Sequence, residues 1–187
     1  MSYQNIAFIG KARSGKDTAG ARLVYNWAFT RLAFADPLKR MALQLDPEIP
    51  SPYNRNDTKR LSAIVGAYGW ETAKDMYPEV RRLLQRMGQT VRELDEDFWV
   101  DVLMDKVRQG DRWNMPVVVT DCRYRNEAEA LRAAGFILVR IKRPDLMASD
   151  SHASECELDN FPTDETVINA GRISDLHTAV DALVRAR

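Results

Sequence analysis

A glycine-bracketed loop near the start of the chain constrains the fold more than any other segment. Gly10 and Gly15 enclose four residues, and Lys16 follows them directly. In this G-x-x-x-x-G-K pattern, backbone N–H groups surround phosphate oxygens and the lysine ammonium contacts the outer phosphates. The apolar run 5–9 predicts a buried strand before the loop, and 16–27 predicts a helix whose N-terminal dipole favours an anion. The sequence therefore predicts a site for a nucleoside triphosphate.

The residue after the lysine departs from the commonest form of this motif. Asp17 stands where a Ser or Thr hydroxyl usually ligates magnesium, and Thr18 comes next. Small-molecule kinases of the adenylate kinase kind also lack a hydroxyl at this position and carry Thr next, so the pair favours that branch over GTPases. The motif leaves open how magnesium is held.

Length and charge exclude several classes of protein. A chain of 187 residues predicts one domain, with room for inserted lobes. Lys plus Arg and Asp plus Glu number 27 each, which argues against a binding surface for polymeric nucleic acid. Neither a secretion signal nor an apolar run of membrane-spanning length is found, so we expect no membrane partner and a cytoplasmic protein. Cys122 and Cys156 lack zinc-ligand spacing and predict two free thiols.

Short β-branched runs alternate with helical segments at both ends of the chain, which predicts a parallel α/β sheet covered by helices on both faces. Strands are expected at 5–9, 31–34, 115–120, 136–142 and 166–168. Helices are expected at 16–27, 36–45, 58–66, 79–87, 97–109, 126–134 and 174–187. The segment 46–57 holds three prolines and predicts irregular structure, so that 36–110 should be all helix and loop.

The end of the strand 115–120 carries a second group of polar residues. Asp121 and Arg123 follow the strand, and Glu127 lies one turn into the next helix. Ligands of open parallel sheets bind beyond the carboxyl ends of strands, so Asp121 and Arg123 should face the same crevice as the phosphate loop. An aspartate there can hold magnesium and an arginine can grip phosphate. A capping turn is the alternative for Asp121, and Glu127 could equally be a solvated charge.

An arginine cluster in the middle of the chain offers charge for the transferred group. Three arginines fall within 81–86, and Gln85, Gln89 and Thr90 add groups able to read a base edge. Phosphoryl transfer needs guanidinium groups around the migrating phosphate, although such a cluster is as often a solvated helix face. The aromatic pair 98–99 could stack on a base or belong to the core.

A basic strand end and a polar loop form the fourth group. Arg143 directly follows the strand 136–142, and the polar stretch 149–155 suggests a mobile lid over the phosphates. Within it, His152 is interpreted as structural rather than catalytic. The turn at 169–171 could approach an adenine ring.

Taken in order, these segments resemble the deoxynucleoside monophosphate kinases of tailed bacteriophages, a branch of the P-loop nucleoside monophosphate kinases. The resemblance rests on Arg13-Ser14-Gly15-Lys16-Asp17-Thr18, Arg81-Arg82-Leu83-Leu84-Gln85 with Gly88, Phe98-Trp99-Val100, Asp121-Cys122-Arg123 with Glu127, and Arg143-Pro144 before Ser151-His152-Ala153-Ser154-Glu155. It implies a P-loop kinase fold with a core at about 1–35 and 112–187, a helical acceptor-binding lobe at about 36–111, and a lid at about 143–160.

The resemblance also implies transfer of the γ-phosphoryl of ATP to a deoxynucleoside monophosphate, with Mg²⁺, in the host cytoplasm if the chain is phage-encoded. A homodimer is left open. The catalytic candidates are Lys16, Arg82 and Arg123. The ATP-binding candidates are Arg13, Ser14, Gly15, Lys16, Asp17, Thr18, Arg143 and Asn169. The acceptor-binding candidates are Asp36, Lys39, Arg82, Gln85, Gly88, Trp99, Asp121, Arg123 and Glu127, and the metal candidate is Asp121.

One departure and two rivals qualify this interpretation. Ala12 replaces a lysine that some relatives place near the acceptor phosphate, so Arg13 or Lys39 would supply that contact. The first rival is a kinase for another phosphorylated metabolite, of the phosphomevalonate or dephospho-coenzyme A type, which shares Phe-Ala-Asp at 34–36. The second is a binding module that senses or hydrolyses ATP, which leaves the cluster 81–86 without a role.

Overall fold

The computed structural model describes residues 3–54, 56–145 and 157–187, which form two compact units. The first unit contains the residues up to Phe34 and from Val100 onward, and the second contains 35–99. Each unit has a hydrophobic core of its own. The expected lid falls mostly on 146–156, so this prediction, together with those for His152 and Cys156, lies outside the described residues.

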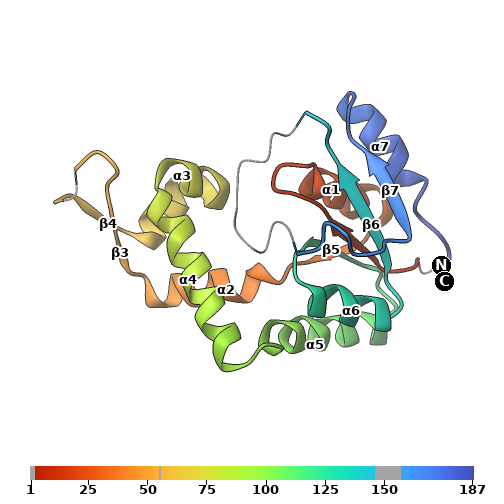
Figure 1. Ribbon diagram of the computed structural model, residues 1–187, viewed down its shortest axis with the longest axis horizontal. Coiled ribbons are helices and arrows are strands. Elements are labelled where there is room, and N and C mark those ends of the chain that lie inside the picture. Colours follow the sequence, from red (N-terminus) through yellow and green to blue (C-terminus); the bar gives the residue numbers. More distant parts are fainter. Residues whose placement is uncertain (1–2, 55, 146–156) are drawn as a thin grey trace. The chain divides into compact units, whose positions relative to one another are not determined.

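The first unit is built on a parallel sheet of five strands, which confirms the predicted fold class. Its strands run in the order β2-β5-β1-β6-β7 (Figure 1), with every neighbouring pair parallel. They are β1 (Ile6–Ile9), β2 (Thr30–Leu32), β5 (Val117–Cys122), β6 (Ile137–Lys142) and β7 (Glu165–Ile168). The central strand β1 is buried along its whole length. Continuous apolar runs are what a strand covered on both faces requires.

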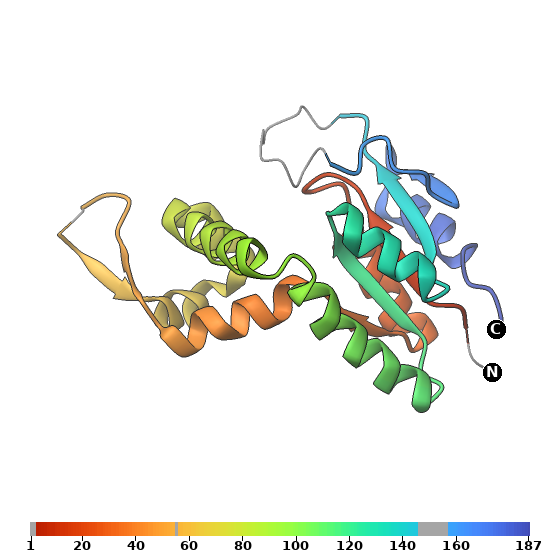
Figure 2. The same ribbon diagram turned by 60° about the horizontal axis from the view of Figure 1, so that its bottom comes forward.

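Helices cover both faces of this sheet. Helices α1 (Lys16–Trp27) and α7 (Ile173–Asp181) lie on one face, and α5 (Phe98–Arg112) and α6 (Arg125–Ala133) lie on the other (Figures 1 and 2). Apolar residues of α1 and α7 share one core with the sheet. The last helix ends at Asp181, so its expected extension to residue 187 is wrong. The chain instead turns back, and the N–H of Gln4 donates to the carbonyl oxygen of Arg185 at 2.9 Å.

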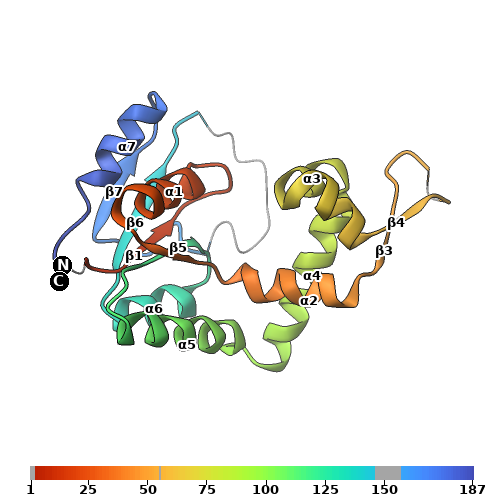
Figure 3. The same cartoon turned by 180° about the vertical axis from the view of Figure 1, so that it is seen from behind.

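The second unit combines three helices with a small hairpin, which can be followed in Figure 3. Its elements are α2 (Ala35–Leu45), β3 (Glu48–Pro50), β4 (Thr58–Arg60), α3 (Leu61–Met76) and α4 (Pro78–Leu94). The helices pack around buried apolar side chains, which are Ala42, Ile49, Leu61, Ile64, Ala73, Tyr77, Val80 and Leu84. Only Ile49 of this set comes from the hairpin, so helix–helix packing forms most of this core.

The hairpin overturns the expectation that this stretch holds only helix and loop. Strands β3 and β4 pair antiparallel, with Pro50 opposite Thr58. A two-stranded ribbon has only edge strands, so a proline N that faces outward loses no ladder hydrogen bond. The start of the next helix is shifted accordingly, to Leu61 rather than 58. Proline content therefore excluded a central strand here but did not exclude an edge strand.

Two glycines that were expected to end helices lie inside them. Helix α3 continues past Gly66 to Met76, with non-helical angles at Gly69 (φ 70°, ψ 167°), and α4 continues past Gly88 to Leu94. At Gly88 a Cβ atom would lie 3.3 Å from Leu38 Cδ2 of α2. The glycine thus serves the close approach of two helices rather than a helix end.

The boundary of the second unit also differs from the expected residue 111. The unit ends at Trp99, so α5 belongs to the first unit from Val100 onward. Leu103 and Val107 of this helix are buried, and a Cβ atom at Gly110 would lie 3.1 Å from Val117 of β5. A helix pattern predicts an apolar face but does not indicate which neighbour covers it.

Candidate nucleotide-binding site

The predicted phosphate loop leaves β1 and enters α1 through two glycines that other residues could not replace. Gly10 has φ 153°, and a Cβ atom there would overlap the carbonyl oxygen of Ile141. Gly15 has φ 109° and precedes the first residue of α1. Side chains disfavour this backbone region, whereas glycine adopts it without steric cost. The glycines therefore permit a tight turn beside the end of β6.

Lys16 directs its ammonium into the loop. Its side chain is buried, with 6% of the residue exposed, and Nζ donates to the carbonyl oxygens of Gly10 at 2.5 Å and Lys11 at 2.7 Å. A buried cation requires such polar partners. The loop carbonyls therefore hold the ammonium next to the N-terminus of α1, where the helix dipole also favours an anion.

A pocket of about 340 Å³ opens beside this loop. It is lined by the loop, the first turn of α1, the end of β6 and the turn that leads into α7, namely Arg13, Gly15, Lys16, Asp17, Thr18, Arg143, Asn169, Gly171, Ile173 and Leu176. The structure thus brings together all the ATP-binding candidates except Ser14, which is buried within the loop. Their contact with ATP stays a prediction.

Two hydroxyl groups near the loop are suited to a polar ligand. Ser14 Oγ and Thr120 Oγ1 are buried and have no hydrogen-bond partner among the described residues. An unsatisfied buried hydroxyl costs about 1–3 kcal/mol. The loop therefore fits a phosphate group, because its N–H groups, its ammonium and the hydroxyl of Ser14 all favour negatively charged oxygen.

For magnesium, the described residues offer few protein ligands. The part of the chain that the structure describes holds no cluster of three or more His, Cys, Asp or Glu side chains. Magnesium in phosphoryl-transfer sites usually takes one or two protein ligands and completes its shell with phosphates and water. Asp121, at the end of β5, can supply one such ligand, and its Oδ1 accepts the N–H of Phe34 at 2.8 Å, which fixes its direction.

Glu127 supports the backbone at the end of β5. It is only 2% exposed, and its Oε2 accepts the N–H groups of Arg123 at 2.8 Å and Tyr124 at 3.1 Å. The alternative that Glu127 is a solvated charge is therefore wrong. Its carboxylate satisfies donors at the start of α6, which fixes the backbone of Arg123.

Cys122 lies between these residues as a buried free thiol. Burial raises the pKa of this thiol well above its ordinary value, and the charges of Glu127 and Asp121 act in the same direction. Lys16 opposes them to a smaller extent. The thiol is therefore protonated at neutral pH and serves as an apolar packing group rather than a nucleophile.

The remaining acceptor candidates lie in the second unit, where most of them are half-buried. Arg82 has 71% of its side chain exposed and pairs with Glu79 at 2.8 Å, one helical turn away. Gln85 is half-buried on the same helix, and Asp36 is in the first turn of α2. The ammonium of Lys39 lies 5.8 Å from the centroid of the Trp70 ring. These side chains belong to one unit, but their contact with an acceptor stays a prediction.

Trp99 occupies the interior rather than the surface of that unit. It is 3% exposed, and its Nε1 donates to the carbonyl oxygen of Gly88 at 3.3 Å. Phe98 packs edge-on against it, with ring centroids 4.9 Å apart. Trp99 therefore belongs to the core, which was one of the two interpretations of this aromatic pair. Its hydrogen bond to Gly88 joins two of the acceptor candidates.

Sequence reasoning missed two residues of the pocket and one ion pair of the loop. Ile173 and Leu176 line the pocket from α7, and only the apolar spacing of that helix gave a signal for them. Lys11 of the loop pairs with Asp159 at 3.5 Å, and both side chains are about half exposed. No local pattern could join two charges so distant in the chain.

The fold and the loop together define a P-loop nucleotide-binding domain of the kinase type. Residues 70–180 match the family model described as deoxynucleotide monophosphate kinase. The chain therefore belongs to the deoxynucleotide monophosphate kinase family, and its activity is that of a phosphotransferase. The phosphate loop precedes the matched residues, so its geometry is an observation independent of the match.

Individual relatives agree with this assignment. A protein of Acanthamoeba polyphaga mimivirus, whose name places it with the deoxynucleotide monophosphate kinases, is 26% identical over 96% of this chain and 95% of its own. The deoxynucleotide monophosphate kinase of Enterobacteria phage T4 is 29% identical over 54% of this chain, and that of Escherichia phage RB69 is 29% identical over 57%. These alignments cover 43% and 45% of the two phage kinases. Among the described residues, no helix is long and apolar enough to cross a membrane.

Proposed function

We propose that this protein transfers the γ-phosphoryl group of ATP to a deoxynucleoside monophosphate and releases ADP and the deoxynucleoside diphosphate. The observation that carries the proposal is the buried Lys16 ammonium, held inside a glycine loop that opens into a pocket. Membership of the family supplies the class of acceptor. In the reaction an acceptor phosphate oxygen bonds to the γ-phosphorus as the bond to the bridging β–γ oxygen breaks.

The donor nucleotide is proposed to lie in the pocket beside α1. The loop N–H groups and Lys16 would hold the β- and γ-phosphates, and Arg143, at the pocket wall, would add positive charge. Asn169, Gly171 and Ile173 line the part of the pocket formed by the turn into α7, which supports a position for the base. Asp121 would hold magnesium, which when bound would supply positive charge that neutralises the phosphates.

The acceptor is proposed to need cationic and polar side chains around it, and no general base. A phosphate oxygen is already anionic, so its attack requires no strong general base. Arg123 has its backbone fixed by Glu127, which supports a defined position for its guanidinium. In the second unit Arg82 is the best exposed candidate, and Gln85 lies on the same helix. Each guanidinium would stabilise charge on the migrating group.

A coupled assay across the four deoxynucleoside and four ribonucleoside monophosphates, with ATP and Mg²⁺, tests the proposal. We expect ADP release that depends on at least one deoxynucleoside monophosphate, with the diphosphate as the second product. ADP release without any acceptor would instead support the ATP-hydrolysing module. Transfer only to phosphomevalonate or dephospho-coenzyme A would support the metabolite kinase, which the family match does not favour.

A further inference from the structure

The turn between β7 and α7 contacts the phosphate loop through one side chain. Asn169 Nδ2 donates to the carbonyl oxygen of Ser14 at 2.9 Å. The backbone N–H of Asn169 donates to the carbonyl oxygen of Lys142 at 2.7 Å, which anchors the residue at the end of β6. A carbonyl oxygen can only accept, so the carboxamide must present its NH₂ group to the loop. Asn169 thus links the sheet to the loop.

The loop is shaped to receive this side chain. A Cβ atom at Gly15 would lie 2.6 Å from Asn169 Nδ2 and 3.3 Å from Leu176 Cδ2. Asn169 therefore occupies the space that a side chain at position 15 would need. The requirement for glycine at this position has two causes, since φ is 109° and the neighbouring carboxamide leaves no room.

The contact fixes the orientation of one peptide group. In a trans peptide the C=O and the following N–H point in opposite directions. Holding the oxygen of Ser14 against Asn169 therefore directs the N–H of Gly15 to the other side. The carbonyl oxygen of Gly15 accepts from the N–H of Ala19 at 2.9 Å, so the next peptide is fixed as well. The two bonds preorganise the loop at the start of α1.

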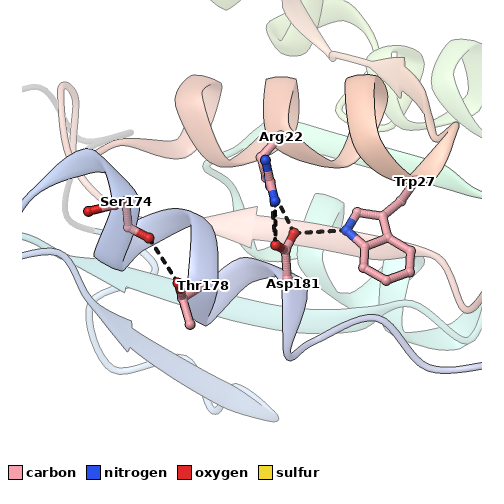
Figure 4. A network of polar contacts seen from close by, with 5 residues as sticks. All are labelled: Arg22, Trp27, Ser174, Thr178 and Asp181. Atoms are coloured by element: carbon pink, nitrogen blue, oxygen red, sulfur yellow. Dashed lines mark hydrogen bonds and ion pairs between the residues drawn. The ribbon is translucent and has the colours of Figure 1, made fainter.

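Helix α7 is also tied to α1 at its far end. Asp181 accepts hydrogen bonds from Arg22, at 2.6 Å from Nη2 and at 3.0 and 3.2 Å from Nε to its two oxygens. It accepts another from Trp27 Nε1 at 2.8 Å (Figure 4). Within α7, Thr178 donates to the carbonyl oxygen of Ser174 at 3.0 Å. The helix is therefore held at its C-terminal end by side chains remote from the pocket, while Asn169 acts just before its N-terminal end.

We propose that Asn169 is a positioning residue that fixes the Ser14–Gly15 peptide in its phosphate-binding orientation before ATP arrives. This inference rests on the proposed function for the identity of the ligand. It assigns to Asn169 a role through the loop backbone, beyond its place in the pocket wall. Preorganised donors bind an anion better because the ligand does not have to order them.

The test compares Asn169→Ala with Asp181→Asn in the full chain. Binding of a fluorescent ADP analogue with Mg²⁺ is titrated at equilibrium, and KM is measured separately for ATP and for the acceptor. We expect Asn169→Ala to weaken analogue binding and raise the KM for ATP about tenfold, with the acceptor KM within about twofold of wild type. Asn169→Asp, which places a carboxylate against the Ser14 oxygen and the phosphates, should be worse.

The control variant separates positioning from stability. Asp181→Asn weakens a side-chain contact at the C-terminal end of α7, away from the pocket, so it should lower the melting temperature and leave analogue binding unchanged. Unchanged binding in Asn169→Ala, or equal weakening in both variants, would overturn the positioning role. Failure of the proposed function looks different, because the wild-type protein would then bind the analogue yet transfer no phosphoryl group to any deoxynucleoside monophosphate.

Discussion

The two units differ in which part of the chain builds their candidate sites. In the first unit the site is formed mainly by the backbone, because two glycines, the start of α1 and a buried lysine converge on one pocket. In the second unit the candidates are side chains on helices, and the arginines are paired with acids on the surface. A backbone site is formed before any ligand binds. A site of exposed side chains acquires its geometry only with the ligand.

This difference predicts how each unit responds to substitution. Changes in the loop should damage a preorganised site and reduce both nucleotide binding and transfer. Changes in the helical unit should remove single contacts and leave ATP binding intact.

Replacing Lys16 with alanine is expected to have the largest effect. The loss of a fixed charge next to the transferred group should reduce kcat by about 10²–10³-fold, equivalent to roughly 3–4 kcal/mol of barrier. Steady-state kinetics with ATP and the preferred acceptor measure it. Lys59→Ala, an exposed position on β4, serves as the control and should retain wild-type kinetics. Full transfer by a folded Lys16→Ala protein would refute the role of the loop.

Glycine substitutions compare the backbones of the two units directly. Gly15→Ala places a Cβ atom against Asn169 in a left-handed conformation, so we expect at least tenfold weaker nucleotide binding and about 1–2 kcal/mol lower stability. Gly66→Ala in α3 meets no atom within 4 Å and should be neutral or stabilise the protein by up to about 1 kcal/mol. Denaturant unfolding and analogue titration report both quantities. Equal changes in stability and in nucleotide binding for the two variants would contradict the proposed difference between the two units.

Arg82 tests the helical unit with a close match in the other unit. Arg82→Ala should raise the acceptor KM about tenfold and leave the KM for ATP unchanged, because a guanidinium hydrogen bond to phosphate is worth about 1.5–3 kcal/mol. Arg108 is also exposed and also pairs with an acid three residues away. Arg108→Ala should therefore behave like wild type. If Arg82→Ala raised the KM for ATP and Arg108→Ala did not, Arg82 would contact the donor nucleotide rather than the acceptor.

The same contrast explains what the sequence could predict. Strand runs such as 117–120 and the glycine loop carry local signals, and the parallel sheet and the loop were predicted from them. Asn169 was predicted as an ATP-binding residue within a turn, but its bond to Ser14 could not be predicted because it joins residues far apart in the chain. The helix was expected to stop before Gly88, because composition does not reveal that Leu38 of α2 packs closely against this glycine. Glu127 was left undecided because burial is a tertiary property.

The smallest expected effect concerns pH and the far end of α7. The hydrogen bond from Arg22 lowers the pKa of Asp181, against the opposing effect of burial, and Trp27 adds to the lowering. Because the folded-state pKa lies below that of the unfolded chain, the stabilisation is complete above the unfolded value and is lost as the pH falls through the folded one. Asp181→Asn should therefore lower the free energy of unfolding by about 1 kcal/mol at pH 7. This difference in free energy between the variant and wild type, the gap, should close as the pH falls.

Urea unfolding of both proteins from pH 7 down to about pH 2.5 measures this gap across the window in which aspartates titrate. Asp105→Asn, in an exposed pair on α5, is the matched control and should show little gap at any pH, because exposed pairs contribute little. A gap for Asp181→Asn that stays constant into acid would mean that the aspartate charge does not hold α7 to α1. Helix α7 would then be held on α1 by the apolar packing of their shared core alone.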